Sequence, residues 1–295
     1  MPSIEVVITD LDNTLYDWFE AWYESFNAMI KVLLAKSGVP RDVLLAQAKQ
    51  IHELNGTSEY SFLIEELPCL QNLHPGADLA AIYSDAVEAY RNARERTLRL
   101  YPGVWETLEY LHTQRTLLVA YTDSLAFYSK SRVRNLQLDG LLDFVFSPPD
   151  HPFPEGFSPE QKRRHPPEYY ELQQTQYRSL PKGESKPNPK VLLDIIVEIG
   201  ADDKRVVYVG DSKVKDVSMA QQAGVIDVWA AYGESHRRDG YDLLRRVTHW
   251  KQADVERERL LQPDEVVPSY ALMNDFSEIR DLFSFTAYQR RIVAE

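Results

Sequence analysis

The sequence has little cysteine, no long apolar run and, over its first tenth, no basic residue. Its one cysteine among 295 residues, Cys69, cannot form an intramolecular disulfide and belongs to no metal-binding spacing, which fits a reducing compartment. No stretch approaches the roughly 18 consecutive apolar residues that a membrane-spanning helix needs. A positively charged start followed by an apolar segment is also missing, so we expect no export signal, no membrane partner and a soluble cytoplasmic protein.

The charge balance is acidic and unevenly distributed. There are 45 Asp and Glu residues against 33 Lys and Arg residues, which gives a formal net charge of −12. Without a long Lys/Arg run, this balance argues against a nucleic acid polymer as the partner, because gripping a phosphate backbone requires clustered basic side chains. Residues 1–30 carry six acidic side chains and no basic one, which is half of the net charge. The first tenth of the chain is therefore where we expect a bound cation.

Hydrophobic periodicity divides the chain into a helical block and a strand–helix alternation. Residues 4–9 predict a short buried strand, and residues 17–36 predict an amphipathic helix whose packing face includes Trp18, Trp22 and Phe26. Further helices are predicted over residues 41–54, 58–66 and 78–97. Beyond them, strands at 117–121, 144–147, 206–210 and 225–232 alternate with helices at 103–114, 125–136, 188–199 and 213–223.

This order predicts an α/β fold, with a Rossmann-like three-layer parallel-sheet core and an inserted α-helical cap domain. The core comprises residues 1–15 and 101–295, and the cap comprises residues 16–100. Two polar insertions in the core, at about 148–185 and 234–267, follow the carboxyl ends of predicted strands. Because ligands of open α/β sheets bind at that edge, these insertions could frame a site.

Polar residues follow three of the predicted strands. Asp10 and Asp12 follow the first strand, Thr122-Asp123-Ser124 follows the strand at 117–121, and Gly210-Asp211-Ser212 ends the strand at 206–210, with Asp216 shortly after. Lys186 lies in a loop before a helix. Each feature alone has a simple explanation, such as an Asx-turn, a helix N-cap or a surface lysine. Two carboxylates as close as Asp10 and Asp12, however, repel each other unless a cation or a proton intervenes.

Together, in order and in strand context, DLDNT, Thr122, Lys186 and GDSKVKD resemble the four motifs of the haloacid dehalogenase superfamily of hydrolases. The helical block at 16–100 is similar to the first-position cap of that family. The resemblance implies that Asp10 is the nucleophile, which forms an aspartyl-phosphate intermediate. It implies that Asp12 protonates the leaving oxygen and later activates water. Mg²⁺ would be held by Asp10, Asp211 and the backbone carbonyl of Asp12.

The resemblance also assigns the residues around these three carboxylates. Thr122, Asp123 and Lys186 fall at the phosphate-binding positions, and Thr14, Ser212 and Asp216 at supporting positions. Asp216 would orient metal-bound waters. The family commonly has Asn where this chain has Asp123, and an additional carboxylate beside a phosphate is unfavourable unless it is paired.

Asp12 favours phosphoryl transfer, because family members that displace halide from carbon lack this second aspartate. The resemblance therefore implies a phosphomonoester hydrolase acting on a small phosphorylated metabolite. The run DNTLY also resembles nucleotidase members, which adds nucleoside monophosphates to the candidate substrates. Two alternatives stay open: a phosphomutase of the same family, and a non-catalytic binding or regulatory protein on this scaffold. The sequence leaves the substrate and the oligomeric state open.

Overall fold

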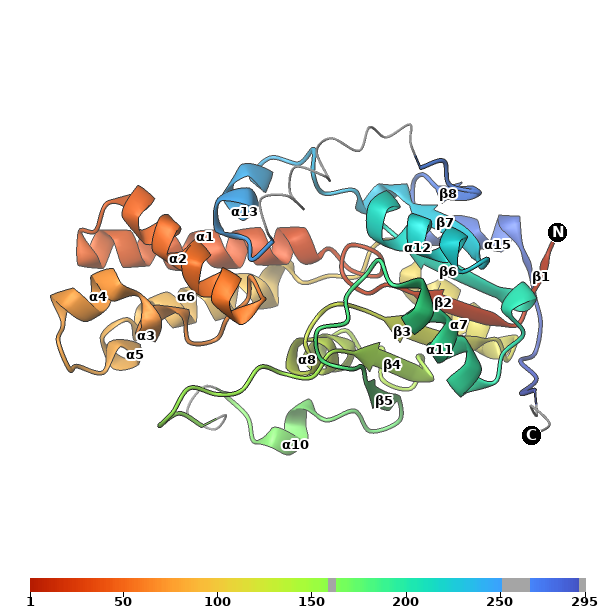
Figure 1. Cartoon of the computed structure of the whole chain (residues 1–295), viewed down its shortest axis with the longest axis horizontal. Helices are drawn as coiled ribbons and strands as arrows, with labels where there is room; N and C mark the ends of the chain where they lie inside the picture. Colours follow the sequence, from red (N-terminus) through yellow and green to blue (C-terminus); the bar gives the residue numbers. More distant parts are fainter. Residues whose placement is uncertain (159–162, 251–265, 292–295) are drawn as a thin grey trace. The chain divides into compact units, whose positions relative to one another are not determined.

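The computed structural model describes residues 1–158, 163–250 and 266–291. Its centre is a seven-stranded sheet in which every neighbouring pair is parallel, in the order β5-β4-β3-β2-β6-β7-β8 (Figure 1). These strands are β2 (Val6–Thr9), β3 (Leu117–Tyr121), β4 (Phe144–Ser147), β5 (Gln176–Ser179), β6 (Val206–Gly210), β7 (Ile226–Ala230) and β8 (Tyr270–Leu272). A separate parallel pair joins β1 (Ser3–Ile4) to β9 (Ser284–Phe285). The predicted α/β fold with a parallel core sheet is confirmed.

The strand order places a topological switch point at β2. The chain runs outward from β2 through β3, β4 and β5, and then returns to the other side of β2 with β6, β7 and β8. Loops that leave the carboxyl ends of β2 and β6 therefore diverge to opposite sides of the sheet. Ligand sites of doubly wound sheets form in the crevice that this divergence leaves.

The helices that accompany the core sheet are short. They are α7 (Val104–Thr113), α8 (Ala126–Asn135), α10 (Pro167–Tyr170), α11 (Pro189–Ile199), α12 (Ser218–Gln222) and α15 (Ile279–Leu282). Three-residue 3₁₀ turns lie at Asp203–Arg205, Ala231–Gly233 and Phe276–Glu278, and a π-helix covers Lys213–Val217. None of the helices described combines the length and the apolar character that crossing a membrane requires.

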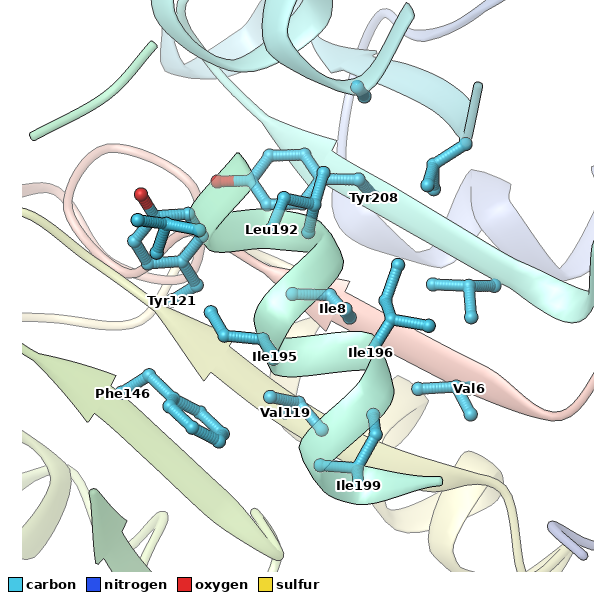
Figure 2. Close-up of a cluster of buried hydrophobic side chains, with 14 of the residues drawn as sticks. Val6, Ile8, Val119, Tyr121, Phe146, Leu192, Ile195, Ile196, Ile199 and Tyr208 are labelled. Carbon is cyan, nitrogen blue, oxygen red and sulfur yellow. The ribbon is translucent and has the colours of Figure 1, made fainter. Parts of the chain in front are cut away.

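One face of the sheet is closed by α11. Its apolar stripe, which includes Leu192, Ile195 and Ile196, packs with alternate residues of the strands, such as Val6 and Ile8 of β2 (Figure 2). The intervening Val7 points to the other face and is also buried. A strand buried on both faces is typical of a sheet covered by layers on each side, which explains why the strand sequences are continuously apolar.

The chain forms two compact units. The first comprises Met1–Asp17, Arg99–Glu234 and the described part of Gln262–Glu295, and it contains the sheet. The second comprises Trp18–Leu98 and the described part of Ser235–Leu261. Its helices are α1 (Trp18–Ser37), α2 (Arg41–Asn55), α3 (Leu63–Glu66), α4 (Pro68–Leu73), α5 (Leu79–Ile82), α6 (Ser84–Thr97) and α13 (Tyr241–Val247). The insertion predicted after the first strand is thus helical throughout its regular elements, as a first-position cap requires.

Aromatic side chains form the packing face of α1. Trp22 and Phe26 are 2% and 1% exposed, and their ring centroids lie 5.2 Å apart in a stacked arrangement. Trp18 stacks on Trp22 and donates its indole N–H to Glu59 at 3.0 Å. The aromatic stripe is therefore a packing face, as its helical spacing predicted.

The segment that carries α13 differs from its predicted assignment. The sequence placed the whole insertion at 234–267 in the core, whereas residues 235–250 group with the helical unit. The reason is that α13 buries Leu243, Leu244 and Val247, packs on α1 and α2, and accepts a hydrogen bond from His52 at the Val247 carbonyl. Residues 251–265 of this insertion and residues 159–162 of the other lie outside the described residues.

Candidate active site

Asp10 stands directly after β2, at the switch point of the sheet. Its backbone N–H donates to the carbonyl of Val209 at 2.8 Å, which continues the β2–β6 ladder one residue beyond the strand. Its side chain is almost fully buried, and Oδ1 lies 2.8 Å from Nζ of Lys186. Apart from this ion pair, Oδ1 accepts no hydrogen bond within the described part of the chain. The site thus begins with a buried carboxylate whose lone pairs are mostly unused.

A tight turn after Asp10 brings the chain back across the edge of the sheet. Asn13 adopts a left-handed conformation (φ 58°), which a short polar side chain tolerates. Thr14 lies at the end of this turn, and its hydroxyl donates to Oδ1 of Asp211 at 3.5 Å. A Cβ on Gly233 would run into the backbone carbonyl of Asn13, so a glycine is needed for the close approach of the two loops. The turn therefore links the first and the last of the predicted motifs.

Lys186 is the positive centre of the site. Its ammonium lies 2.8 Å from Oδ1 of Asp10 and 2.8 Å from Oδ1 of Asp216, and it donates to the hydroxyl of Tyr208 at 3.2 Å. Burial alone would lower the pKa of Lys186, but the two carboxylates together raise it well above its usual range. The lysine is therefore held as a cation, although it is only 6% exposed.

Three carboxylates converge beside Lys186. Asp10, Asp211 and Asp216 each offer an oxygen within 4.8 Å of the others. Burial, followed by the negative charge of Asp216, raises the pKa of Asp10 to about 7, against the opposing effect of Lys186. Burial and the charges of Asp216 and Asp10 also raise the pKa of Asp211 well above its usual range. One ammonium is too little positive charge for three carboxylates this close together, two of them buried, so this donor set fits a small hard cation such as Mg²⁺.

Asp216 is fixed by the π-helix Lys213–Val217. Its Oδ1 accepts from the Tyr208 hydroxyl at 2.9 Å, and its Oδ2 accepts from the backbone N–H of Ser212 at 3.0 Å. The hydroxyl of Ser212 in turn accepts from the N–H of Lys215 at 3.1 Å and caps this turn. A Cβ on Gly210 would collide with the Asp216 side chain, so the glycine leaves room for this carboxylate. Two of the expected supporting residues, Ser212 and Asp216, are thus joined directly by a hydrogen bond.

The loop after β3 is tied to the Lys186 loop. Thr122 is buried, its hydroxyl accepts from the N–H of Ser124 at 3.1 Å, and its own N–H donates to the Phe146 carbonyl at 3.1 Å. Oδ1 of Asp123 accepts from the backbone N–H of Lys186 at 3.0 Å. The carboxylate at this unusual position is therefore paired with a backbone donor, which removes the main objection to a negative charge there.

Asp12 has its own donors. The hydroxyl of Ser124 donates to Oδ2 at 2.5 Å, and Nη1 of Arg132 donates to Oδ1 at 3.2 Å. The two carboxylates that follow β2 therefore have different cationic partners: Asp10 pairs with Lys186, and Asp12 pairs with Arg132.

A model of the family described as haloacid dehalogenase-like hydrolase matches residues 4–224, about three quarters of the chain. The chain belongs to this family. A second model of the same kind of hydrolase matches residues 184–271, which include Lys186, Asp211 and Asp216. A search of curated protein sequences returned no match.

Solved structures show the same fold at low sequence identity. A 2-haloacid dehalogenase from Pseudomonas syringae pv. Tomato DC3000 is 20% identical, with a TM-score of 0.56, and the match covers 95% of this chain and 97% of that one. A predicted phosphoglycolate phosphatase from Haemophilus somnus 129pt is 18% identical, with a TM-score of 0.51 and the same coverage. The Bacillus subtilis protein YfnB, bound to magnesium, is 15% identical with a TM-score of 0.51, over 95% of this chain and 98% of that one.

In this haloacid dehalogenase-like hydrolase, motif reasoning from the sequence left two residues of the site unmentioned. Tyr208 fits the apolar strand pattern and carries no motif, yet its hydroxyl accepts from the Lys186 ammonium and donates to Oδ1 of Asp216. Arg132 was counted only as a helix residue. The available signal was its position, because it shares the buried stripe of α8 with Ser129 and Val133, where an arginine needs a buried partner.

Proposed function

We propose that this hydrolase cleaves phosphomonoesters through an aspartyl-phosphate on Asp10, with Mg²⁺ as cofactor and a small phosphorylated metabolite as substrate. One observation carries the proposal: two carboxylates at the end of β2 have separate partners, with Lys186 beside Asp10 and Ser124 with Arg132 beside Asp12. The two chemical roles that phosphate ester hydrolysis requires, nucleophile and proton donor, are thereby assigned to different environments.

The nucleophilic step uses Asp10. Its carboxylate oxygen forms a bond to phosphorus as the bond from phosphorus to the ester oxygen breaks, and the ammonium of Lys186 offsets charge between the two anions. Asp12 gives its proton to the departing ester oxygen. Water then attacks the phosphorus of the aspartyl-phosphate, Asp12 takes up the proton of that water, and inorganic phosphate and the Asp10 carboxylate are released.

The cation would be held by Asp10, Asp211 and the backbone carbonyl of Asp12, with Asp216 close enough to contribute an oxygen or to orient bound waters. When bound, Mg²⁺ supplies positive charge that keeps Asp10 ionised near neutral pH and offsets the phosphate charge. Thr122 and the Lys186 ammonium would contact the phosphoryl oxygens. Asp123 supports this arrangement through the Lys186 backbone.

Asp12 selects phosphate rather than halide chemistry. Fold likeness extends to a dehalogenase and to a predicted phosphatase alike, so it does not choose between them. An alkoxide is a poor leaving group and needs a proton, whereas a halide leaves as a stable anion. The protonatable, hydrogen-bonded carboxylate of Asp12 has a purpose only in the first case.

The test is turnover of a panel of phosphomonoesters, nucleoside monophosphates included, in Mg²⁺ and in EDTA. We expect phosphate release by the wild type only with Mg²⁺, and a loss of about 10³-fold or more in Asp10→Asn, because the amide is not a nucleophile. Asp194→Asn is the matched control, since that carboxylate lies on the exposed face of α11 and pairs with the exposed Lys190. Equal turnover in all conditions would contradict the proposal.

Two further measurements address the alternatives. In ¹⁸O-labelled water, a hydrolase incorporates the label into inorganic phosphate, whereas a phosphomutase leaves the phosphoryl group on an organic product. Acid-quenched transfer of a labelled phosphoryl group to wild type but not to Asp10→Asn would exclude a non-catalytic protein.

A further inference from the structure

Arg132 lies beneath the candidate proton donor. It belongs to α8, is 5% exposed, and its Nη1 donates to Oδ1 of Asp12 at 3.2 Å and to the hydroxyl of Ser124 at 2.9 Å. That hydroxyl donates to the other carboxylate oxygen of Asp12 at 2.5 Å. The three side chains form a closed triangle in which each member contacts the other two. Both oxygens of Asp12 are thereby fixed.

The triangle is anchored to the backbone of the loop after β3. The hydroxyl of Ser129 donates to the carbonyl of Ser124 at 2.8 Å and to that of Leu125 at 3.1 Å, which ties the first turn of α8 to the loop. The guanidinium of Arg132 also lies over the rings of Tyr128 and Tyr16, with centroids at 5.4 and 6.0 Å. These rings confine the guanidinium, so its direction toward Asp12 is set by packing as well as by charge.

A buried arginine requires an anionic partner, because desolvating an unpaired guanidinium is costly. Tyr16 adds a second polar group to the same place: it is fully buried, and its pKa is raised well above its usual range, first by burial and then by the charge of Asp12. Burying these polar groups around Asp12 costs folding free energy, and a helix with a purely structural role would not need them there. A proton donor that must meet a leaving oxygen in one orientation accounts for this arrangement.

We propose that Arg132, with Ser124, is a positioning residue that holds the carboxyl group of Asp12 in line with the leaving oxygen of the substrate. This inference rests on the proposed phosphomonoester hydrolysis. It predicts that the loss of kcat on removing Arg132 is larger for substrates whose leaving group needs a proton. An alkyl phosphate such as glycerol phosphate needs that proton, whereas p-nitrophenyl phosphate releases a stable anion and does not.

The experiment compares kcat on these two substrates in Arg132→Met. We expect kcat for the alkyl ester to fall about 10- to 100-fold, part of the 10²- to 10⁴-fold that general acid catalysis contributes, while kcat for the aryl ester falls less than about threefold. The readout is the ratio of the two kcat values. Because both are measured on one preparation, the ratio is independent of the fraction of folded enzyme.

Arg134→Met is the matched control. Arg134 lies on the same helix, donates to the Glu171 carbonyl at 3.1 Å and pairs with Asp139 at 3.5 Å, away from Asp12. Its substitution should leave the ratio unchanged. Arg132→Lys should recover part of the alkyl activity, because it keeps the charge without the planar guanidinium. Ser124→Ala should shift the ratio in the same direction by a smaller factor, and it serves if Arg132→Met does not fold.

An unchanged ratio in both Arg132→Met and Ser124→Ala would overturn the inference, as would a loss confined to KM. Absence of wild-type turnover on every phosphomonoester of the panel would instead refute the proposed function. The two failures are therefore distinguishable.

Discussion

The two units of this hydrolase bury different kinds of side chain. The sheet unit places charged groups in its interior, among them Asp10, Lys186 and Asp216, and each is held by an opposite charge or a hydrogen bond. The helical unit is stabilised at its centre by stacked aromatic rings, such as Trp22 on Phe26. Burying a charge destabilises the folded state, whereas burying aromatic surface stabilises it.

The difference shows that the sheet unit, which holds the candidate active site, is the unit in which buried charge lowers stability. In the sheet unit, burial first and the neighbouring carboxylates second raise the pKa values of Asp10 and Asp211. In the helical unit, His52 is a buried titratable group whose pKa is lowered to about 4 by burial, although a backbone hydrogen bond to Val247 opposes the shift. His52 therefore stays neutral near pH 7 and behaves as part of the packing.

Removing the Lys186 ammonium should have the largest effect on the sheet unit. Lys186→Met leaves Asp10 and Asp216 without their ion pairs, so we expect phosphomonoester turnover to fall about 10³-fold or more. In EDTA, the free energy of unfolding should fall by about 3–5 kcal/mol, because removing one partner leaves uncompensated buried charge. Steady-state kinetics and urea unfolding measure the two effects.

Lys190→Met is the control for this substitution. Lys190 lies four residues further along the chain and pairs with Asp194, but both side chains are largely exposed, at 83% and 61%. An exposed ion pair contributes about 0–1 kcal/mol, so both readouts should barely change. Comparable losses in the two variants would show that Lys186 has no special place in the site.

In the helical unit, acid should act through His52. Its pKa is about 4 in the folded protein and near 6.5 when unfolded, so between these values the unfolded chain binds more protons. Stability should therefore be constant above pH 6.5 and fall as the pH decreases toward 4, by an amount that approaches about 3 kcal/mol. Hydrogen exchange of α2 and α13 between pH 7 and 4 measures this effect in the unit concerned.

His52→Gln should remove this part of the pH dependence, because an amide can still donate to the Val247 carbonyl but does not titrate. His112→Gln, at an exposed position of α7, should leave it in place. A slope that persists unchanged in His52→Gln would assign the acid sensitivity of the helical unit to other groups.

Site residues that directly follow strands could be predicted from the sequence, whereas a site residue in the middle of a helix could not. Asp10, Thr122 and Asp211 follow strands that β-branched, apolar runs predict, and parallel strands bring their carboxyl ends to one edge. Arg132 lies in the middle of a helix, and its approach to Asp12 depends on which face of α8 turns inward. The sequence pattern indicates that face only weakly, because serines share the buried stripe of α8 with its apolar residues.

The same limit explains α13. The insertion that contains it, residues 234–267, is polar and Arg-rich in the sequence. The place of α13 in the helical unit rests on packing with α1 and α2 and on the hydrogen bond between His52 and Val247, which are 195 positions apart. Only tertiary packing selects such a partner. The alternation of strands and helices predicted the core because most of its crossovers connect neighbouring strands, and the α13 segment follows no such rule.

The smallest expected effect concerns Asp123, where this chain departs from the common pattern of its family. Its Oδ1 accepts from the Lys186 N–H at 3.0 Å, and an asparagine offers a carbonyl oxygen to the same donor. Asp123→Asn should therefore change kcat by less than about threefold, whereas Asp123→Ala, which leaves this N–H without its partner, should lower kcat about tenfold. Steady-state kinetics on one phosphomonoester would separate the two. Equal losses in both variants would mean that the negative charge, rather than the hydrogen bond, is what the site requires, and the lysine loop would then be positioned by electrostatics alone.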